Sequence, residues 1–411
     1  CADNAGARYS AVDVAGKELL LNYEFARSRA AFVRHYANAA RAEGVVFSSG
    51  MLGRLERGEA ALELATRTHN TAERVRYSND SLAETMWAGE MAALERARRR
   101  IARQGPRPGF LFGCNAFRFA DSEEYASRYT GLLNLATLPF YRGATEREEG
   151  QPNYSRVEAI LNKTAGTNLV LKGHPLVWFH RAGIPEFLKK KAWDELRTSC
   201  RAYILRSVGR FRSRIHAWDV INEAHDWAND LNLDQQQLLD ITRVAAESTR
   251  AADPTAFRVV NSCCTWGEYV ATRRSYSGPL NREARTPLEY VQAVEEARVP
   301  YEAIGLQVYY PARDMLEIER HLERFFVFSK PIHITELGVS SSSAPPSRTG
   351  EIRLPNRNVW HGAEWSEQIQ ADWIEQFYTI CYSKPQVEAI TWWDFADPAF
   401  IPHGGLLHAD Y

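Results

Sequence analysis

The chain has 411 residues, of which 45% are hydrophobic and 25% are charged, and its formal net charge is −1. This length allows a barrel together with a second small domain. A near-neutral chain without a basic stripe lacks the charge pattern of a nucleic-acid-binding protein, and no apolar run approaches the roughly 20 residues of a membrane span.

Residues 1–105 are predicted to form a small accessory region that contains β-structure. KELLLNYEF (17–25) and ALELATRTHN (61–70) are predicted strands, whereas 28–44 and 83–105 have helical spacing. The second helix, rich in Ala and Arg, would lead into the next domain. We expect the region to act as a structural cap rather than a carbohydrate-binding module, because no exposed aromatic stripe is visible.

The six cysteines, at positions 1, 114, 200, 263, 264 and 381, show neither a CxxC pair nor the spacing of a metal site. We expect buried free thiols, and no disulfide between the adjacent Cys263 and Cys264. A chain that starts at Cys1 raises two interpretations. Cys1 is lipidated in a processed bacterial lipoprotein, or the chain simply starts where it was cut. Membrane attachment is expected only through such a lipid.

Residues 106–411 show eight short apolar runs that alternate with helical patterns. The runs are 109–117, 132–140, 169–178, 215–223, 257–263, 303–310, 331–339 and 389–397. Eight strands that alternate with helices predict an α/β fold with a parallel sheet closed into a (β/α)8 TIM barrel. Asp234 is a predicted N-cap, and Thr286 with Pro287 starts another helix. No closing helix follows the eighth strand, so we expect the gene product to continue.

Two predicted strands end in a glutamate. WDVINEA (218–224) places Glu223 after Asn222, and HITELGV (333–339) places Glu336 after an alternating apolar run. The carboxyl ends of barrel strands meet at one face, where the long loops 140–155 and 340–366 are also expected. Two carboxyl groups at that face suit glycoside hydrolysis, in which one protonates the leaving oxygen and the other acts at the anomeric carbon.

An ordered set of motifs over roughly 108–411 resembles glycoside hydrolase family 10, the endo-β-1,4-xylanases. These motifs are EEGQPNYSR (148–156), GHPLVWFH (173–180), WDVINEA, IGLQ (304–307), HITELGV and ITWWDFAD (390–397), while FLFGCN (110–115) and ATLPFY (136–141) resemble a divergent bacterial subgroup. The resemblance implies endo-acting, retaining hydrolysis of xylan, with Glu336 as an ionised nucleophile of low pKa. Glu223 would be the acid/base of raised pKa, and Asn222 would bind the sugar 2-hydroxyl.

The resemblance also assigns the rest of the pocket. His174 and Trp178 would line the subsite at the cleavage point together with Lys172, Gln307 would contact the sugar or the nucleophile, and Trp392 would be a platform under the ring. Trp393 is a second possible platform, and Asn261, at the end of the fifth strand, is a weaker candidate.

Three departures from the family pattern affect specificity. TLPFY (137–141) replaces a Glu-Asn pair and a Lys that bind the next sugar in many relatives, so Tyr141 and Arg142 are the expected substitutes. Tyr309 stands where the family has a His, and Gly338 where it has an Asp. Because a phenol can donate to a carboxylate and lower its pKa, we predict that Tyr309 donates a hydrogen bond to Glu336.

Alternative functions remain open. One is a retaining hydrolase of another β-linked glycan, or an exo-acting variant, and another is a non-catalytic carbohydrate-binding protein. A metalloenzyme is disfavoured, because His174, His180 and His216 lack ligand spacing. The expected protein is a monomer that acts on a polysaccharide outside the cytoplasm of a bacterium, with no metal, no cofactor and no nucleic-acid partner.

Overall fold

The computed structural model describes residues 16, 18–276, 278–309, 313–344 and 359–411. The chain folds as two compact units. One unit contains residues 1–107, 312–323 and 372–385, and the other contains 108–311, 324–371 and 386–411. Cys1 lies outside the described residues, as does much of the loop 340–366.

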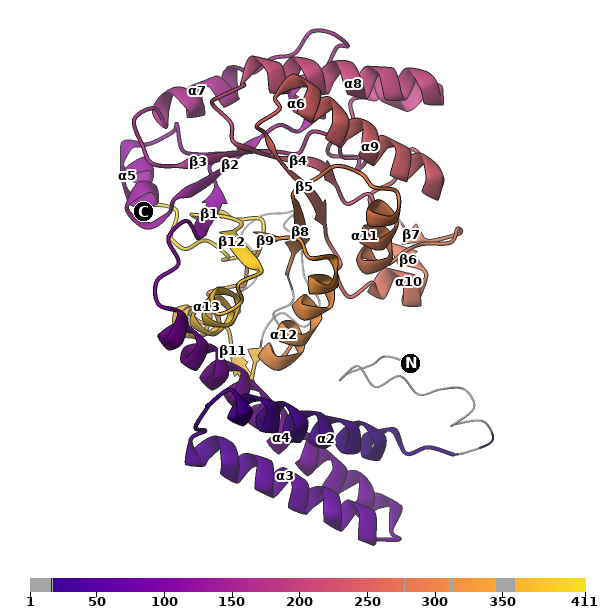
Figure 1. The fold of residues 1–411 in the computed structure, drawn as a ribbon, viewed down its shortest axis with the longest axis vertical. Helices are drawn as coiled ribbons and strands as arrows, with labels where there is room; N and C mark the ends of the chain where they lie inside the picture. The colour runs from indigo at the N-terminus through magenta and orange to yellow at the C-terminus, as the bar shows by residue number, and fades with distance from the viewer. Residues whose placement is uncertain (1–15, 17, 277, 310–312, 345–358) are drawn as a thin grey trace. The chain divides into compact units, whose positions relative to one another are not determined.

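The second unit is built on a closed barrel of eight parallel strands (Figure 1). The strands are β1 (Leu111–Asn115), β2 (Leu135–Pro139), β3 (Val170–His174), β4 (Ala217–Asn222), β5 (Phe257–Ser262), β8 (Ala303–Gln307), β9 (Ile332–Glu336) and β12 (Val387–Trp392). Their order around the barrel is β1-β12-β9-β8-β5-β4-β3-β2. All eight predicted strands, and the predicted (β/α)8 class, are therefore confirmed.

Helices follow the strands of the barrel, as the alternating pattern predicts. They are α5 (Glu123–Leu132), α6 (Arg142–Thr145), α7 (Ser155–Lys163), α8 (Trp193–Arg210), α9 (Gln235–Ala252), α10 (Glu268–Thr272) and α11 (Pro287–Glu296), with 3-10 helices at Glu186–Lys190 and Arg324–Phe328. The predicted N-caps are confirmed, because Asp234 accepts from the Gln237 N–H at 2.8 Å and Thr286 accepts from the Glu289 N–H at 3.3 Å. Two short hairpins, β6 (Arg274–Ser275) with β7 (Gly278–Pro279) and β10 (Val359–Trp360) with β11 (Ala363–Glu364), lie outside the barrel sheet.

The first unit is helical, so the prediction of strands at 17–25 and 61–70 is wrong. Its helices are α2 (Leu21–Ala42), α3 (Ser49–Arg67), α4 (Thr71–Gln104) and α12 (Met315–Glu323), together with the part of α13 (Glu367–Tyr382) from Asp372 onward. The predicted helices at 28–44 and 83–105 correspond to parts of α2 and α4 (Figure 1). In α3 the buried residues include Met51, Leu55 and Gly58, a spacing of four and three that belongs to a helix face.

Polar contacts in the helical unit join segments far apart in sequence. The Tyr36 hydroxyl donates to Glu319 Oε2 at 2.6 Å, Lys384 pairs with the same carboxylate, and Arg29 pairs with Asp314 at 2.8 Å. Segments from the first and the last third of the chain are therefore needed for this unit. None of the described helices is long and apolar enough to cross a membrane.

Candidate active site

The two predicted catalytic carboxyl groups lie at the ends of β4 and β9, and both are buried, with 7% of Glu223 and 6% of Glu336 exposed. Glu223 has a positive φ of 57°, which is uncommon for a residue other than glycine. Its backbone N–H donates to the Asn261 carbonyl of the neighbouring β5 at 2.8 Å. The turn is therefore held in place at the rim of the barrel.

A hydrogen-bond network of amides joins the two carboxyl groups. Gln307 donates to Glu223 Oε1 at 2.9 Å and to Asn222 Oδ1 at 3.3 Å. Asn261 donates to Asn222 Oδ1 at 2.7 Å and to Glu336 Oε1 at 3.3 Å. Both glutamates therefore face one polar compartment inside the rim, as the sequence predicts.

Asn261 occupies a space that a glycine creates. A Cβ at Gly305 would lie 2.7 Å from Asn261 Oδ1, and Thr335 donates to the same oxygen. Asn261 is only a weak candidate from the sequence, because nothing local in the sequence indicates that β8 leaves room for its side chain.

Glu223 is surrounded by neutral donors. The Trp178 indole donates to Glu223 Oε2 at 2.9 Å, and Gln307 binds the other oxygen. Burial raises the pKa of Glu223 above its ordinary value, while these donors oppose the rise. The carboxyl partner of Gln307 is thus Glu223, whereas the sequence predicts a contact with the sugar or with Glu336.

Glu336 is connected to charged groups. His174 Nε2 lies 3.7 Å from Glu336 Oε1, and His174 Nδ1 lies 2.7 Å from Asp219 Oδ2. Lys172 Nζ lies 2.9 Å from the same Asp219 oxygen. Burial alone would raise the pKa of Asp219, but Lys172 and His174 hold it below its ordinary value. Asp219 is therefore an anion that orients His174, a role that the sequence did not reveal.

Lys172 is predicted to bind substrate, but its side chain is 2% exposed and its ammonium group is bound to Asp219. We therefore assign it no contact with the sugar. Burial lowers the pKa of His174, so the ring is neutral and its Nδ1–H donates to Asp219. Its Nε2 then carries a free electron pair.

Tyr309 donates a hydrogen bond to Glu336 Oε2 at 3.1 Å, so the predicted contact is confirmed. The expected low pKa of Glu336 is not. Burial raises it well above its ordinary value, Glu223 and Asp219 raise it further, and Lys172 and Tyr309 oppose the rise. Two neighbouring buried carboxyl groups disfavour each other's ionisation.

The prediction that Trp392 is a platform under the sugar ring is wrong. Trp392 is fully buried and its indole donates to the Gly404 carbonyl at 2.7 Å, so it cannot present a face to a sugar. Trp393 instead lies beside His174, with ring centroids 5.2 Å apart. Tyr141 lies 5.5 Å from His174 and 5.7 Å from Trp178, which supports its predicted place at the site.

Arg142, the other expected substitute on the second loop, does not reach the site. It is 6% exposed and pairs with Glu146 at 2.7 Å, and it also donates to Ser199 at 2.9 Å. Its role is to fix the loop after β2.

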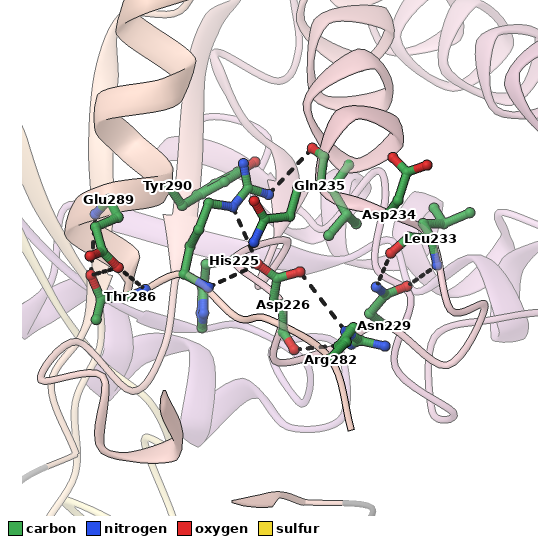
Figure 2. A network of polar contacts seen from close by, with 12 residues as sticks. His225, Asp226, Asn229, Leu233, Asp234, Gln235, Arg282, Thr286, Glu289 and Tyr290 are labelled. Atoms are coloured by element: carbon green, nitrogen blue, oxygen red, sulfur yellow. Dashed lines mark hydrogen bonds and ion pairs between the residues drawn. The ribbon is translucent and has the colours of Figure 1, made fainter. Parts of the chain in front are cut away.

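The loop after β4 is fixed by a buried carboxylate. Figure 2 shows Asp226 close to Arg282, which comes from the segment after β5. Arg285 Nε, from the same segment, donates to Asp226 Oδ2 at 3.2 Å, and Arg282 Nη2 donates to the Asp226 carbonyl at 3.2 Å. Asn229 closes the same loop by bonding both backbone groups of Leu233, at 2.8 and 2.9 Å. The loop after β4, next to Glu223, is therefore held in place by these side-chain contacts.

The cysteines and histidines do not suggest a metal centre. The described cysteines are free thiols, as predicted, and four of them are buried while Cys264 is partly exposed. Within the described ranges, no group of three His, Cys, Asp or Glu side chains is arranged to hold a metal ion.

The family model described as glycosyl hydrolase family 10 matches residues 141–400, which is more than half of the chain. The chain belongs to glycosyl hydrolase family 10. It is therefore a glycoside hydrolase, as the paired glutamates predict.

Two curated relatives show how low the sequence identity is. The chain is 23% identical to endo-1,4-beta-xylanase B of Thermotoga neapolitana over 303 residues, which cover 70% of this chain and 78% of that protein. It is 24% identical to endo-1,4-beta-xylanase A of Phanerodontia chrysosporium over 268 residues, which cover 63% of this chain and 58% of that protein. The chain thus spans between about three fifths and four fifths of these relatives.

Among solved structures, native xylanase 10B from Thermotoga maritima is similar, with a TM-score of 0.56 and 21% sequence identity. The match covers 74% of this chain and 91% of that one. At this identity the likeness supports the barrel fold alone.

Proposed function

We propose that the chain is an endo-acting, retaining β-1,4-xylanase. The observation that carries this proposal is the amide network that joins buried Glu223 and Glu336 at the rim of the barrel. A retaining mechanism needs two carboxyl groups about 5–5.5 Å apart, one that attacks and one that transfers a proton. The xylanase relatives support xylan as the substrate.

Glu336 is the proposed nucleophile. Its carboxylate attacks the anomeric carbon, the bond to the leaving oxygen breaks, and Glu223 gives its proton to that oxygen. Glu223 then takes a proton from water, which attacks the covalent glycosyl-enzyme and releases the sugar with its original anomeric configuration. This assignment rests on the resemblance of HITELGV (333–339) to the family's nucleophile motif and of WDVINEA (218–224) to its acid/base motif.

Other side chains serve this reaction in proposed roles. Asn222 binds the 2-hydroxyl of the sugar at the cleavage point, and His174 Nε2 accepts from a neighbouring hydroxyl. Trp178, Tyr141 and Trp393 surround the ring. Tyr309 and Asn261 donate to Glu336 and so favour its ionised form when substrate separates it from Glu223.

The test is hydrolysis of a panel of xylans, cellulose and mixed-linkage glucan, followed by NMR of the first products. We expect short oligosaccharides from internal cleavage of xylan, with the β-configuration retained, and loss of activity in Glu336→Ala. Preference for another glycan, release of single end sugars, or inverted products would contradict the proposal. Binding of xylan without hydrolysis of an activated aryl glycoside would favour the carbohydrate-binding alternative.

We further propose that the enzyme is a monomer that works outside the cytoplasm, because polymeric xylan does not enter cells. The helices of residues 1–105 are proposed to serve stability rather than sugar binding. A measured loss of barrel stability, without a change in KM for xylan, is the expected result of destabilising them.

A further inference from the structure

A buried thiol lies at the end of the strand next to the acid/base. Cys263 follows β5 directly and is 7% exposed. Asn261, two residues earlier, lies beside Asn222 of β4 in the barrel sheet, and its carbonyl accepts from the Glu223 N–H at 2.8 Å. The backbone therefore holds Cys263 beside the turn that carries Glu223, and no step of the proposed reaction uses its thiol.

The thiol of Cys263 has two acceptors within reach. Its Sγ lies 3.6 Å from Nε2 of His225, which is fully buried. Glu223 is the other acceptor, because burial raises the pKa of Glu223 while hydrogen bonds from Gln307, Trp178 and Cys263 oppose that rise. A thiol carries one proton, so it donates to only one of the two acceptors at a time.

The protonation of the His225 ring follows from its other neighbour, Tyr269 of α10. The Tyr269 hydroxyl lies 2.8 Å from His225 Nδ1, and it donates to the backbone carbonyls of His225, at 2.8 Å, and of Arg285. Because a carbonyl can only accept, the single hydroxyl proton is used there, and Nδ1–H donates to the phenol oxygen. Burial lowers the pKa of His225 to about 3, so the ring is neutral and Nε2 has no proton. Nε2 is therefore an acceptor for the Cys263 thiol.

The thiol of Cys263 keeps its proton. Burial raises the pKa of Cys263 well above its ordinary value, and its hydrogen-bonded neighbour Cys264 and the carboxyl groups of Glu223 and Glu336 raise it further. Sulfur is a weak acceptor, so the Cys264 thiol competes little with an imidazole nitrogen or a carboxylate for this proton. The Sγ–H bond of Cys263 therefore turns between His225 and Glu223 by rotation about the Cβ–Sγ bond.

Other titratable groups also face these three side chains. They are Glu336 from the end of β9, Tyr141 after β2 and Cys264 after β5, which face Glu223, together with Arg285, which faces His225, and Tyr269, which faces Cys263. Substitution of Cys263 or His225 leaves all of them in place. A change in the ionisation of Glu223 in such a variant therefore reports the thiol contact.

We propose that Cys263 is a positioning residue for the acid/base, and that its thiol donates to His225 Nε2 while Glu223 is protonated and to Glu223 once Glu223 is ionised. When Glu223 gives its proton to the leaving oxygen, the thiol turns to the new carboxylate. When Glu223 takes a proton from water in the second step, the thiol turns back to His225. The thiol proton stays on sulfur throughout. This inference rests on the proposed function, because it deepens the role of Glu223.

The test follows the alkaline limb of the kcat/KM profile on xylohexaose, which reports ionisation of the acid in the free enzyme. Cys263→Ala removes a donor to the Glu223 carboxylate, so this limb should move to higher pH by about half a unit. His225→Phe keeps a ring but removes the competing acceptor, so the protonated state of Glu223 loses its advantage. The limb should then move to lower pH by about the same amount.

The double variant separates the thiol contact from other effects of the ring. Because the thiol is the proposed link between His225 and Glu223, His225→Phe combined with Cys263→Ala should give the profile of Cys263→Ala alone. Cys263→Val, which refills the volume of the thiol, is the second variant if the alanine variant does not fold, with the same upward shift expected. Cys381→Ala, which removes a fully buried thiol of α13, is the matched control and should leave the profile unmoved.

A measurement without turnover distinguishes this inference from the proposed function. In protein that contains isotopically labelled glutamate, the carboxyl NMR signal missing from Glu223→Gln gives the titration of Glu223, and its midpoint should shift in the same directions as the kinetic limb. Unmoved midpoints, or shifts of the same sign in Cys263→Ala and His225→Phe, would overturn the inference. A wild-type enzyme that is inactive on every xylan substrate, with midpoints that shift as expected, would refute the proposed function alone.

Discussion

Glu223 and Glu336 have the same carboxyl chemistry in different surroundings. Neutral donors, Trp178 and Gln307, hold Glu223. Glu336 accepts from Tyr309 and lies 3.7 Å from the ring of His174, whose other nitrogen is bound to Asp219. Asp219 in turn pairs with Lys172.

Burial raises the pKa of both carboxyl groups. For Glu336 the anions Glu223 and Asp219 raise it further and the cation Lys172 opposes the rise, whereas the groups that lower the pKa of Glu223 are uncharged. Charged neighbours therefore influence the pKa of Glu336 more than that of Glu223.

The largest expected effect distinguishes the two glutamates by the leaving group. Glu223→Ala removes protonation of the leaving oxygen, so hydrolysis of xylan should fall by about 10²–10⁴-fold or more. An aryl glycoside with an acidic phenol needs little protonation, so the first step with that substrate should be nearly retained, and product should then accumulate as glycosyl-enzyme. A pre-steady-state burst of phenol measures this.

Added azide provides the control for that comparison. In Glu223→Ala it should replace water in the second step and give the β-glycosyl azide, whereas in Glu336→Ala it should attack directly and give the α-glycosyl azide. NMR of the products distinguishes them. The reverse pattern would mean that the two roles are exchanged.

The next effect concerns the cation near Glu336. Lys172→Met removes a charge that lowers the pKa of Glu336, so the acidic limb of the kcat/KM profile should move to higher pH. Because Asp219 also loses its ion pair, His174 is held less firmly, and we expect a loss of about 10- to 100-fold at about pH 6. Lys172→Arg keeps the charge and serves as the control. A profile that only decreases in height, without moving, would contradict the electrostatic role.

Tyr309→Phe is expected to have a smaller effect. The hydroxyl donates to Glu336 and favours its charged form, so its loss should raise the pKa of Glu336 and move the acidic limb upward by up to about one pH unit. Activity on the alkaline side of that limb should change little. The pH–rate profile of an aryl xylobioside measures both. An unmoved profile would mean that this hydrogen bond does not tune the nucleophile.

The barrel could be predicted from the sequence because its strands are buried on both faces and alternate with helices, a pattern that local composition reveals. Which tryptophan faces the site could not be decided in this way. Trp392 is the last residue of β12 and Trp393 follows it, so the choice between them depends on the register of the strand in the barrel, which local composition does not reveal. The burial of Lys172 could not be predicted either, because it depends on an ion pair with Asp219 in the neighbouring strand β4.

The N-terminal helices show a different limit of sequence-based prediction. In ALELATRTHN, short apolar runs fit a strand and a helix equally well, and the helix is favoured by packing among α2, α3 and α4. One such contact is the close approach of Gly58 to Thr85, where an added Cβ would lie 2.6 Å from the threonine methyl group. Tertiary packing of this kind cannot be inferred from composition.

The smallest expected effect is on stability, and it separates catalytic from structural carboxyl groups. The pKa of Glu336 in the folded protein is raised above its ordinary 4.5. Below about that pH the carboxyl group is protonated in both the folded and the unfolded protein, so its burial costs little folding stability. As the pH rises toward the folded pKa, the unfolded state ionises first, and the loss of folding stability grows. Glu336→Gln removes that cost. The variant should therefore be more stable than the wild type by on the order of 1 kcal/mol at about pH 7, with no gain at about pH 4.

Glu146→Gln is the matched control, since Glu146 is also fully buried in the barrel unit but pairs with Arg142 and Arg206, each at 2.7 Å. Its loss leaves two guanidinium groups without their anion, so the variant should be less stable by about 2–4 kcal/mol at about pH 7. Thermal unfolding at both pH values measures the pair. If Glu336→Gln were destabilising near neutral pH, the neighbours of Glu336 would stabilise its carboxylate more than burial disfavours it, as in the structural ion pairs of Glu146.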